Sequence, residues 1–199
     1  MTKTDESKQN PSTPPVGQGT RDRLLSSAIH LLARHGLEGT GSAALLDACG
    51  TTKGSLYHFF PGGKHQVVAE ALSLYSESLL SGLMRRFDEA PTSGQALASF
   101  IESVARHQQR EGFAGSCPIA AVALDVPRND PLGEHCHQLL GHWALALAEK
   151  LSPAEPSAGL DLAEWVIATF EGALLMSKVR QSATPLRLAA DQLRRALDG

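Results

Sequence analysis

Residues 51–64, TTKGSLYHFFPGGK, place several hydrogen-bond donors within two turns of a short helix. Lysine, hydroxyl and histidine side chains at this spacing donate to phosphate oxygens and to acceptor groups on base edges. A glycine among them removes a side chain where a helix backbone must approach a duplex closely. The stretch therefore predicts a DNA-contacting helix. Its candidate contact residues are Lys53, Gly54, Ser55, Tyr57 and His58.

The starts of the two neighbouring helices offer further phosphate contacts. Lys64 begins the following helix, where free backbone amides and a partial positive charge already favour an anion. Thr40 and Ser42 begin the preceding helix and offer the same arrangement to the opposite DNA strand. Within the central helix, Leu56, Phe59 and Phe60 are predicted to face inward.

The sequence offers little for catalysis or for metal binding. Cys49, Cys117 and Cys136 lack CxxC spacing, which argues against a disulfide framework and against structural zinc. The eight histidines contain no pair at i, i+4 spacing. His135 and His137 point about 200° apart on a helix. We therefore expect no enzyme activity, no metal and no cofactor.

Composition and charge describe a globular chain with an uneven charge distribution. The 199 residues are 42% hydrophobic, and no apolar run approaches the roughly 20 residues needed to span a bilayer. No secretory leader pattern appears, so we expect a cytoplasmic location and no membrane partner. Residues 20–64 carry five basic and three acidic groups (+2), whereas residues 65–199 carry 11 and 16 (−5). This asymmetry is compatible with DNA binding by the first part only.

Hydrophobic spacing predicts an all-α chain of about nine helices, and no strand pattern appears. Residues 1–19 are rich in Pro, Ser and Thr and poor in apolar side chains, which predicts a disordered tail. Residues 20–64 hold three short helices, the last two in a helix-turn-helix arrangement. Residues 65–199 hold six more, and the helix from about Lys64 to Phe87 is long enough to bridge two domains. Predicted helix caps are Thr20, Thr52, Ser116 and Asp130.

The string GTGSAALLDACGTTKGSLYHFFPGGK, with the amphipathic helix before it, closely resembles the DNA-binding domain of the TetR family of transcriptional repressors. The GTG and FPGGK segments and the later GSCPIAAVALD resemble its LmrA/YxaF-type branch. The resemblance covers about residues 20–198 and is most specific over residues 40–64. It implies that the eight candidate contact residues given above face DNA and adds Thr52 as a ninth. Gly41, Ala43 and Thr51 depart from residues common in the family, so we expect few contacts from the first helix of the motif.

The resemblance also implies that residues 65–199 form a ligand-binding and dimerisation domain. Small residues at 168, 172 and 173 leave one helix face open for close approach, which predicts a homodimer through the last two helices. A dimer would read a palindromic double-stranded DNA operator, and a small lipophilic or aromatic effector would release it. The candidate lining residues of the effector cavity are Phe100, His107, Phe113, Cys117, Trp143, Trp165 and Phe170.

Two other functions remain open from the residues alone. Cys117 stands at a predicted helix N-terminus, where the helix dipole stabilises a thiolate, so a thiol-based redox sensor is one alternative. A helical module that binds another protein without contacting DNA is the second alternative. Replacing Tyr57 or Lys64 separates this module from a DNA-binding protein, because only the latter loses DNA affinity.

Overall fold

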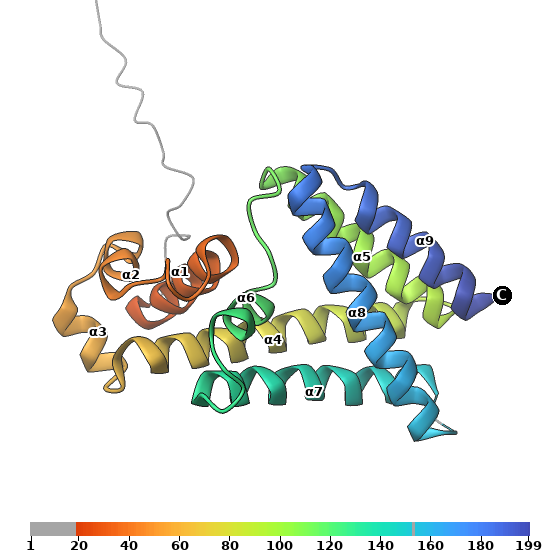
Figure 1. Ribbon diagram of the computed structural model, residues 1–199, viewed down its shortest axis with the longest axis horizontal. Coiled ribbons are helices and arrows are strands. Elements are labelled where there is room, and N and C mark those ends of the chain that lie inside the picture. The colour runs from red at the N-terminus through yellow and green to blue at the C-terminus, as the bar shows by residue number, and fades with distance from the viewer. Residues whose placement is uncertain (1–18, 153) are drawn as a thin grey trace, which may run out of the picture.

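The computed structural model describes residues 19–152 and 154–199, which form nine α-helices and no strand (Figure 1). This confirms the all-α prediction. The predicted disordered tail, residues 1–19, lies outside the described residues except for Gly19. The helices are α1 (Thr20–His35), α2 (Ser42–Cys49), α3 (Lys53–Phe59), α4 (Gly63–Glu89), α5 (Ser93–Arg110), α6 (Pro118–Asp125), α7 (Pro131–Leu151), α8 (Pro156–Arg180) and α9 (Thr184–Asp198).

Two of the predicted helix caps are confirmed and two are wrong. The Thr52 hydroxyl accepts from the Ser55 amide at 3.3 Å, and the Asp130 carboxylate accepts from the Leu132 amide at 2.8 Å. Thr20 is instead the first helical residue, after Gly19 as N-cap. Ser116 does not cap α6, because its hydroxyl donates to the Ala33 carbonyl of α1.

The last long helix begins earlier than its apolar pattern indicates. The predicted start is Leu160, whereas α8 starts at Pro156, inside the segment predicted as a loop. Proline is well suited to the first turn of a helix, because its missing N–H is one that the helix leaves unpaired there. The apolar periodicity begins only in the following turn, so it could not indicate this start.

The first three helices pack around a small core at one end of the molecule. Leu24 of α1, Leu45 of α2, Leu56 of α3 and Phe60 are all buried there. This core continues past the predicted boundary after residue 64, because Val67 and Ala71 of α4 belong to it. The position of α3 is thereby fixed relative to α4.

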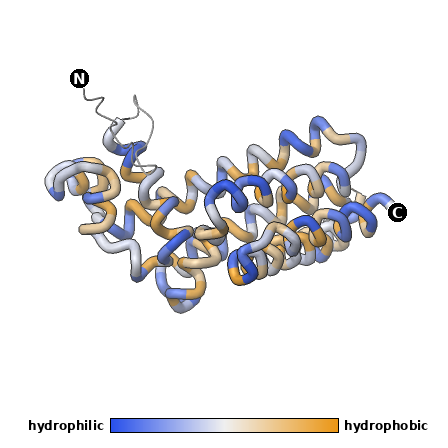
Figure 2. The backbone as a smooth tube through the Cα atoms, turned by 90° about the horizontal axis from the view of Figure 1, so that it is seen from above, coloured by the Kyte–Doolittle hydropathy of each residue, from blue (hydrophilic) through white to orange (hydrophobic). Residues whose placement is uncertain are grey.

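The remaining helices surround a second and larger core. α4, 27 residues long, runs from α3 into the body, where α5 lies against α9 and α7 lies against α8 (Figure 1). Hydrophobic and hydrophilic residues are interspersed along the helices instead of being gathered in one segment (Figure 2). None of the described helices combines the length and apolarity needed to cross a bilayer.

Two contacts fasten α1 to the two ends of α6. At the start of α6, the amide and the hydroxyl of Ser116 both donate to the Ala33 carbonyl, at 2.8 and 2.9 Å. At its end, the Asp125 carboxylate accepts from the Leu37 amide at 2.7 Å. Gly36, with φ of 66°, leaves room for this carboxylate, because an added Cβ would lie 2.7 Å from its oxygen. The end that carries α3 is therefore connected directly to the body.

Candidate nucleic-acid interface and adjoining cleft

The inner face of α3 anchors this short helix to the small core. Leu56 and Phe60 are buried, as predicted, because i, i+4 spacing places both on one side of the helix. The inward prediction for Phe59 is wrong, since 37% of its surface is exposed. Its ring packs edge-on against His58, with 4.9 Å between centroids. Two anchors thus suffice, and the other residues of α3 are free to face outward.

The outer face of α3 presents the polar residues that the motif singled out. Lys53, Gly54 and His58 are exposed, and Tyr57 is 47% exposed. The Lys53 ammonium lies 5.9 Å from the centre of the Tyr57 ring, so the cation and the phenol occupy one patch. Thr52 and Ser55 hydrogen-bond each other through their hydroxyls at 3.2 Å. The structure therefore brings six of the nine predicted contact residues together.

The start of α2 contributes less than the sequence indicates. Ser42 is its first residue and is exposed next to Gly41, whose backbone forms the N-cap. Thr40 is fully buried, and its hydroxyl donates to the Gly36 carbonyl at 2.6 Å. Thr40 thus shapes the turn between α1 and α2 and presents no side chain to a duplex, so we leave it out of the interface proposed below.

Lys64 occupies a structural position in the first turn of α4. Its ammonium donates to the Leu37 carbonyl at 2.8 Å, and its side chain is half-buried. The contact joins the start of α4 to the turn after α1. Lys53 has no such partner among the described residues and is the better candidate for a phosphate contact.

Alanine substitutions should separate the roles of these two lysines. Lys53→Ala is expected to leave the unfolding free energy unchanged and to reduce the slope of log affinity against log salt by about 0.9, because one phosphate contact is lost. Lys64→Ala is expected to lower the unfolding free energy by about 1 kcal/mol through loss of its hydrogen bond. Denaturant titration and DNA titration across salt concentrations measure both quantities. An unchanged salt slope for Lys53→Ala would contradict the assignment.

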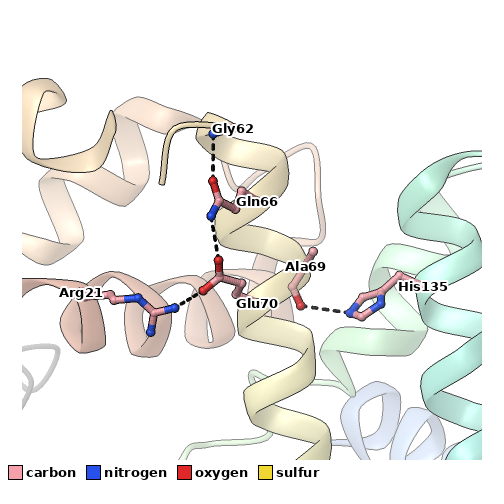
Figure 3. Close-up of polar contacts among 6 residues, drawn as sticks. All are labelled: Arg21, Gly62, Gln66, Ala69, Glu70 and His135. Carbon is pink, nitrogen blue, oxygen red and sulfur yellow. Dashed lines mark hydrogen bonds and ion pairs between the residues drawn. The ribbon is translucent and has the colours of Figure 1, made fainter. Parts of the chain in front are cut away.

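A chain of polar contacts joins the start of α4 to α1 (Figure 3). The Gly62 amide, just after α3, donates to Gln66, and Gln66 donates to Glu70, each at 2.8 Å. Glu70 in turn pairs with Arg21 of α1. On the other side of α4, His135 of α7 contacts the Ala69 carbonyl at 3.1 Å. A movement of α4 would therefore be transmitted to α1 and to α7.

A cleft of about 670 Å³ lies between α1 and the helices of the body. Three of the residues proposed from the sequence for an effector cavity, Phe100, His107 and Phe170, border this cleft. Sequence reasoning did not assign residues from the first two helices to this cavity, because nothing local in their pattern indicates it. The wall comes from α1, α2, α4, α5, the segment before α6, and α8, represented by His30, Ala48, Tyr75, His107, Ser116 and Phe170.

The other four predicted lining residues lie elsewhere. Trp143 borders a separate void of about 30 Å³ and donates to the Ser76 hydroxyl at 2.7 Å. Phe113 is half-buried in the turn after α5, where its φ is 54°. Cys117 is buried between two residues that line the cleft. Trp165 is 43% exposed on the outer face of α8, which leaves it outside both cavities.

Three weak acids, Cys117, Tyr75 and Glu171, are neighbours, and Tyr75 also lines the cleft. Burial raises the pKa of Cys117 well above its usual range, and the neighbouring Glu171 carboxyl acts in the same direction. Burial also raises the pKa of Glu171. Because a sensor needs a thiolate, the redox-sensing alternative loses its physical basis at Cys117. Neither Glu171 nor Tyr75 beside it was a candidate from the sequence, since each resembles an ordinary residue of an amphipathic helix.

Glu171→Gln is expected to raise the unfolding free energy relative to wild type by an amount that grows with pH. The raised pKa means that the folded chain holds this proton at pH values where the unfolded chain, with the usual carboxyl pKa of 4.5, has lost it. The contribution of Glu171 to stability therefore falls as pH rises from 4.5 through the folded pKa, and glutamine removes this fall. Denaturant titrations from about pH 4 to about pH 8 measure the difference. Parallel curves for the two proteins would contradict it.

α3 exposes its polar residues, follows α2 after a short turn and leads into the long α4. This arrangement defines a helix-turn-helix protein with a helical body. Residues 24–71 match the model for bacterial regulatory proteins of the tetR family, and residues 93–192 match the C-terminal domain of LmrA/YxaF-like transcriptional regulators. The chain belongs to the TetR family and is a DNA-binding transcriptional regulator, not an enzyme.

Known proteins resemble the chain over most of its length. The uncharacterized HTH-type transcriptional regulator Rv0196 of Mycobacterium tuberculosis is 30% identical, over 90% of this chain and 95% of its own. The HTH-type transcriptional regulator LmrA of Bacillus subtilis is 28% identical, over 84% and 90%. A solved structure of a cysteine mutant of the TetR family regulator CifR, complexed with operator DNA, has a TM-score of 0.76 at 22% identity, covering 92% of this chain and 99% of its own. The last likeness concerns the fold alone.

Proposed function

We propose that the protein is a repressor that binds a palindromic operator as a homodimer and is released by a small lipophilic or aromatic effector. The cleft carries this proposal, because its wall combines α1 and α2 with α4, α5 and α8. A molecule in this cleft contacts both the helix-turn-helix end and the body. Its occupancy can therefore favour one arrangement of the two over another.

The DNA contacts that we propose come mainly from α3. Its first turn presents Lys53 and Gly54, and Tyr57 and His58 follow on the next turn. Ser42 at the start of α2 supplies a second, smaller contact to the opposite strand. This set lies on one exposed face, as a helix in a major groove requires.

An exposed apolar stripe along α8 supports the homodimer. Trp165, Leu175, Met176 and Val179 are exposed, and Ala168 and Gly172 lie between them at helical spacing. Ala173, which the sequence placed on this face, is instead buried in its own subunit. On the neighbouring α9, Leu188 is 56% exposed. We propose that a second copy covers this stripe through its own α8 and α9.

Effector release then follows from the connections of α1. Ser116 joins the cleft wall to the Ala33 carbonyl, and Asp125 holds the Leu37 amide. A ligand that presses on the segment before α6 changes the position of α1 relative to α4. In a dimer, this changes the separation of the two α3 helices. The ligand must bind the released arrangement more tightly for DNA affinity to fall.

A ligand screen tests this function, with a DNA duplex that the protein selects from a random pool. Fluorescence anisotropy measures operator affinity with and without each aromatic or lipophilic compound, and calorimetry measures compound binding to the free protein. At least one compound that binds the cleft should lower operator affinity by about fivefold or more. A protein that binds many such compounds with unchanged operator affinity would contradict ligand-controlled release.

A further inference from the structure

Leu37, in the turn between α1 and α2, is held from two sides. Its backbone amide donates to the carboxylate of Asp125, the last residue of α6 in the body, at 2.7 Å. Its backbone carbonyl accepts from the ammonium of Lys64, in the first turn of α4, at 2.8 Å. α4 begins only a few residues after the end of α3. One residue thus joins the body to the segment that carries α3.

The turn around Leu37 is closed by its own hydrogen bonds. The Thr40 amide donates to the Leu37 carbonyl at 3.2 Å, and the Thr40 hydroxyl donates to the Gly36 carbonyl at 2.6 Å. Thr40 is fully buried, and α2 begins with Ser42. A displacement of Leu37 therefore moves the start of α2, because the connecting residues are fixed to one another.

Apolar packing alone leaves α1 weakly fixed against the body. Of the described apolar residues of α1, only Leu32 is buried within the larger core, whereas Leu24, Leu25 and Ala28 are buried in the small core. Beside it, the cleft of about 670 Å³ lies between α1 and the helices α5 and α8. The polar contacts to the two ends of α6 therefore carry much of the orientation of α1.

Asp125 occupies a position that its own helix disfavours. The C-terminal end of a helix carries a partial negative charge, which repels an acidic side chain in the last turn. Gly36 matches this carboxylate, because its φ of 66° favours glycine and an added Cβ would lie 2.7 Å from the carboxylate oxygen. A residue that conflicts with its own helix but fits a distant turn is typical of a functional position.

We propose that Asp125 is a positioning residue that determines which operator spacing the protein recognises. Through Leu37 and Lys64 it fixes the angle of the helix-turn-helix end relative to the body, and thereby the distance between the two α3 helices. This deepens and rests on the proposed function, since only a homodimer has this distance. The half-site spacing of an operator mirrors the geometry of the dimer. Without the Asp125 contact, the angle varies and the dimer accepts several spacings.

Palindromic duplexes with altered spacing test this role. Their half-sites are those that the wild-type protein selects from a random pool, placed one or two base pairs closer together or further apart. Each base pair moves a half-site by about 3.4 Å and rotates it by about 35°. Fluorescence anisotropy should show wild type binding its best spacing about tenfold or more tightly than the adjacent spacings. In Asp125→Ala this ratio should fall to about threefold or less.

Further variants control for the hydrogen bond and for the charge. Asp125→Asn keeps an oxygen that accepts from the Leu37 amide, so it should retain most of the wild-type ratio. Glu149→Ala, at an exposed position of α7, removes the same charge and should leave the ratio unchanged. Combining Asp125→Ala with Lys64→Ala should lower the ratio no further than Asp125→Ala alone, because both contacts act through Leu37.

The outcomes distinguish this inference from the function on which it rests. A wild-type protein that binds all spacings equally, an unchanged ratio in Asp125→Ala, or an equal fall in Glu149→Ala would overturn the role of Asp125 and leave the proposed function intact. A wild-type protein that binds no palindrome at any spacing loses the function itself. Partial unfolding of a variant does not imitate the expected result, because a smaller active fraction scales the apparent affinities for all spacings equally.

Discussion

Gly54→Ala should lower operator affinity by about tenfold or more while leaving the fold intact. A Cβ at this position meets only the Thr52 Oγ1, at 3.8 Å, which is an ordinary contact. Inside a helix, alanine is also more stable than glycine by about 0.5–1 kcal/mol. The free protein therefore gains stability, and only a duplex lying against the first turn of α3 would be displaced by the added methyl group.

Gly82→Ala on α4 is the matched control for this substitution. A Cβ there has no neighbour within 4 Å, so the helix gains the same propensity without approaching DNA. Denaturant titration and anisotropy with the selected duplex measure both proteins. If Gly54→Ala bound the operator as tightly as Gly82→Ala, α3 would not approach the duplex through the face that carries Lys53 and Tyr57.

Gly172→Arg should separate the dimer and weaken operator binding by about a hundredfold or more. The glycine lies within the apolar stripe of α8, and a Cβ there meets nothing within 4 Å in the single chain. The arginine is therefore tolerated by the monomer, but it places a charge and a long side chain in the face that we propose is shared. Without the second subunit, each α3 binds its half-site alone and loses the gain from linkage.

Gly141→Arg on α7 controls for the change in charge and helix propensity. This glycine is also exposed, with no neighbour within 4 Å of an added Cβ. Sedimentation velocity gives the oligomeric state, and anisotropy gives the affinity. A dimeric Gly172→Arg protein with full affinity would show that subunits associate through another surface.

The exposed polar face of α3 could be predicted because its information is local. Leu56 and Phe60 fix the buried side through i, i+4 spacing, and the polar residues between them must then face outward. Thr40 and Lys64 have the right chemistry and the right place in the chain. Their hydrogen bonds go to the Gly36 and Leu37 carbonyls, contacts that depend on how the turn after α1 folds.

The cleft could be predicted only in part because its walls come from distant parts of the chain. His30 and His107 both line it, yet they lie on α1 and α5. Aromatic type alone singled out Trp143 and Trp165, but aromatic residues also fill cores and cover interfaces. Trp143 fills the core, and we propose that Trp165 covers the dimer interface. Glu171 carries no sequence signal, because its neighbours Cys117 and Tyr75 come from distant parts of the chain.

Selection of bound duplexes from a random pool, followed by sedimentation of the complex, tests dimeric operator recognition most directly. Two chains on each selected duplex and an enriched inverted repeat, with half-sites about one helical turn apart or more, are the expected result. Enrichment of a single asymmetric site by one chain, or no enrichment at all, would contradict it.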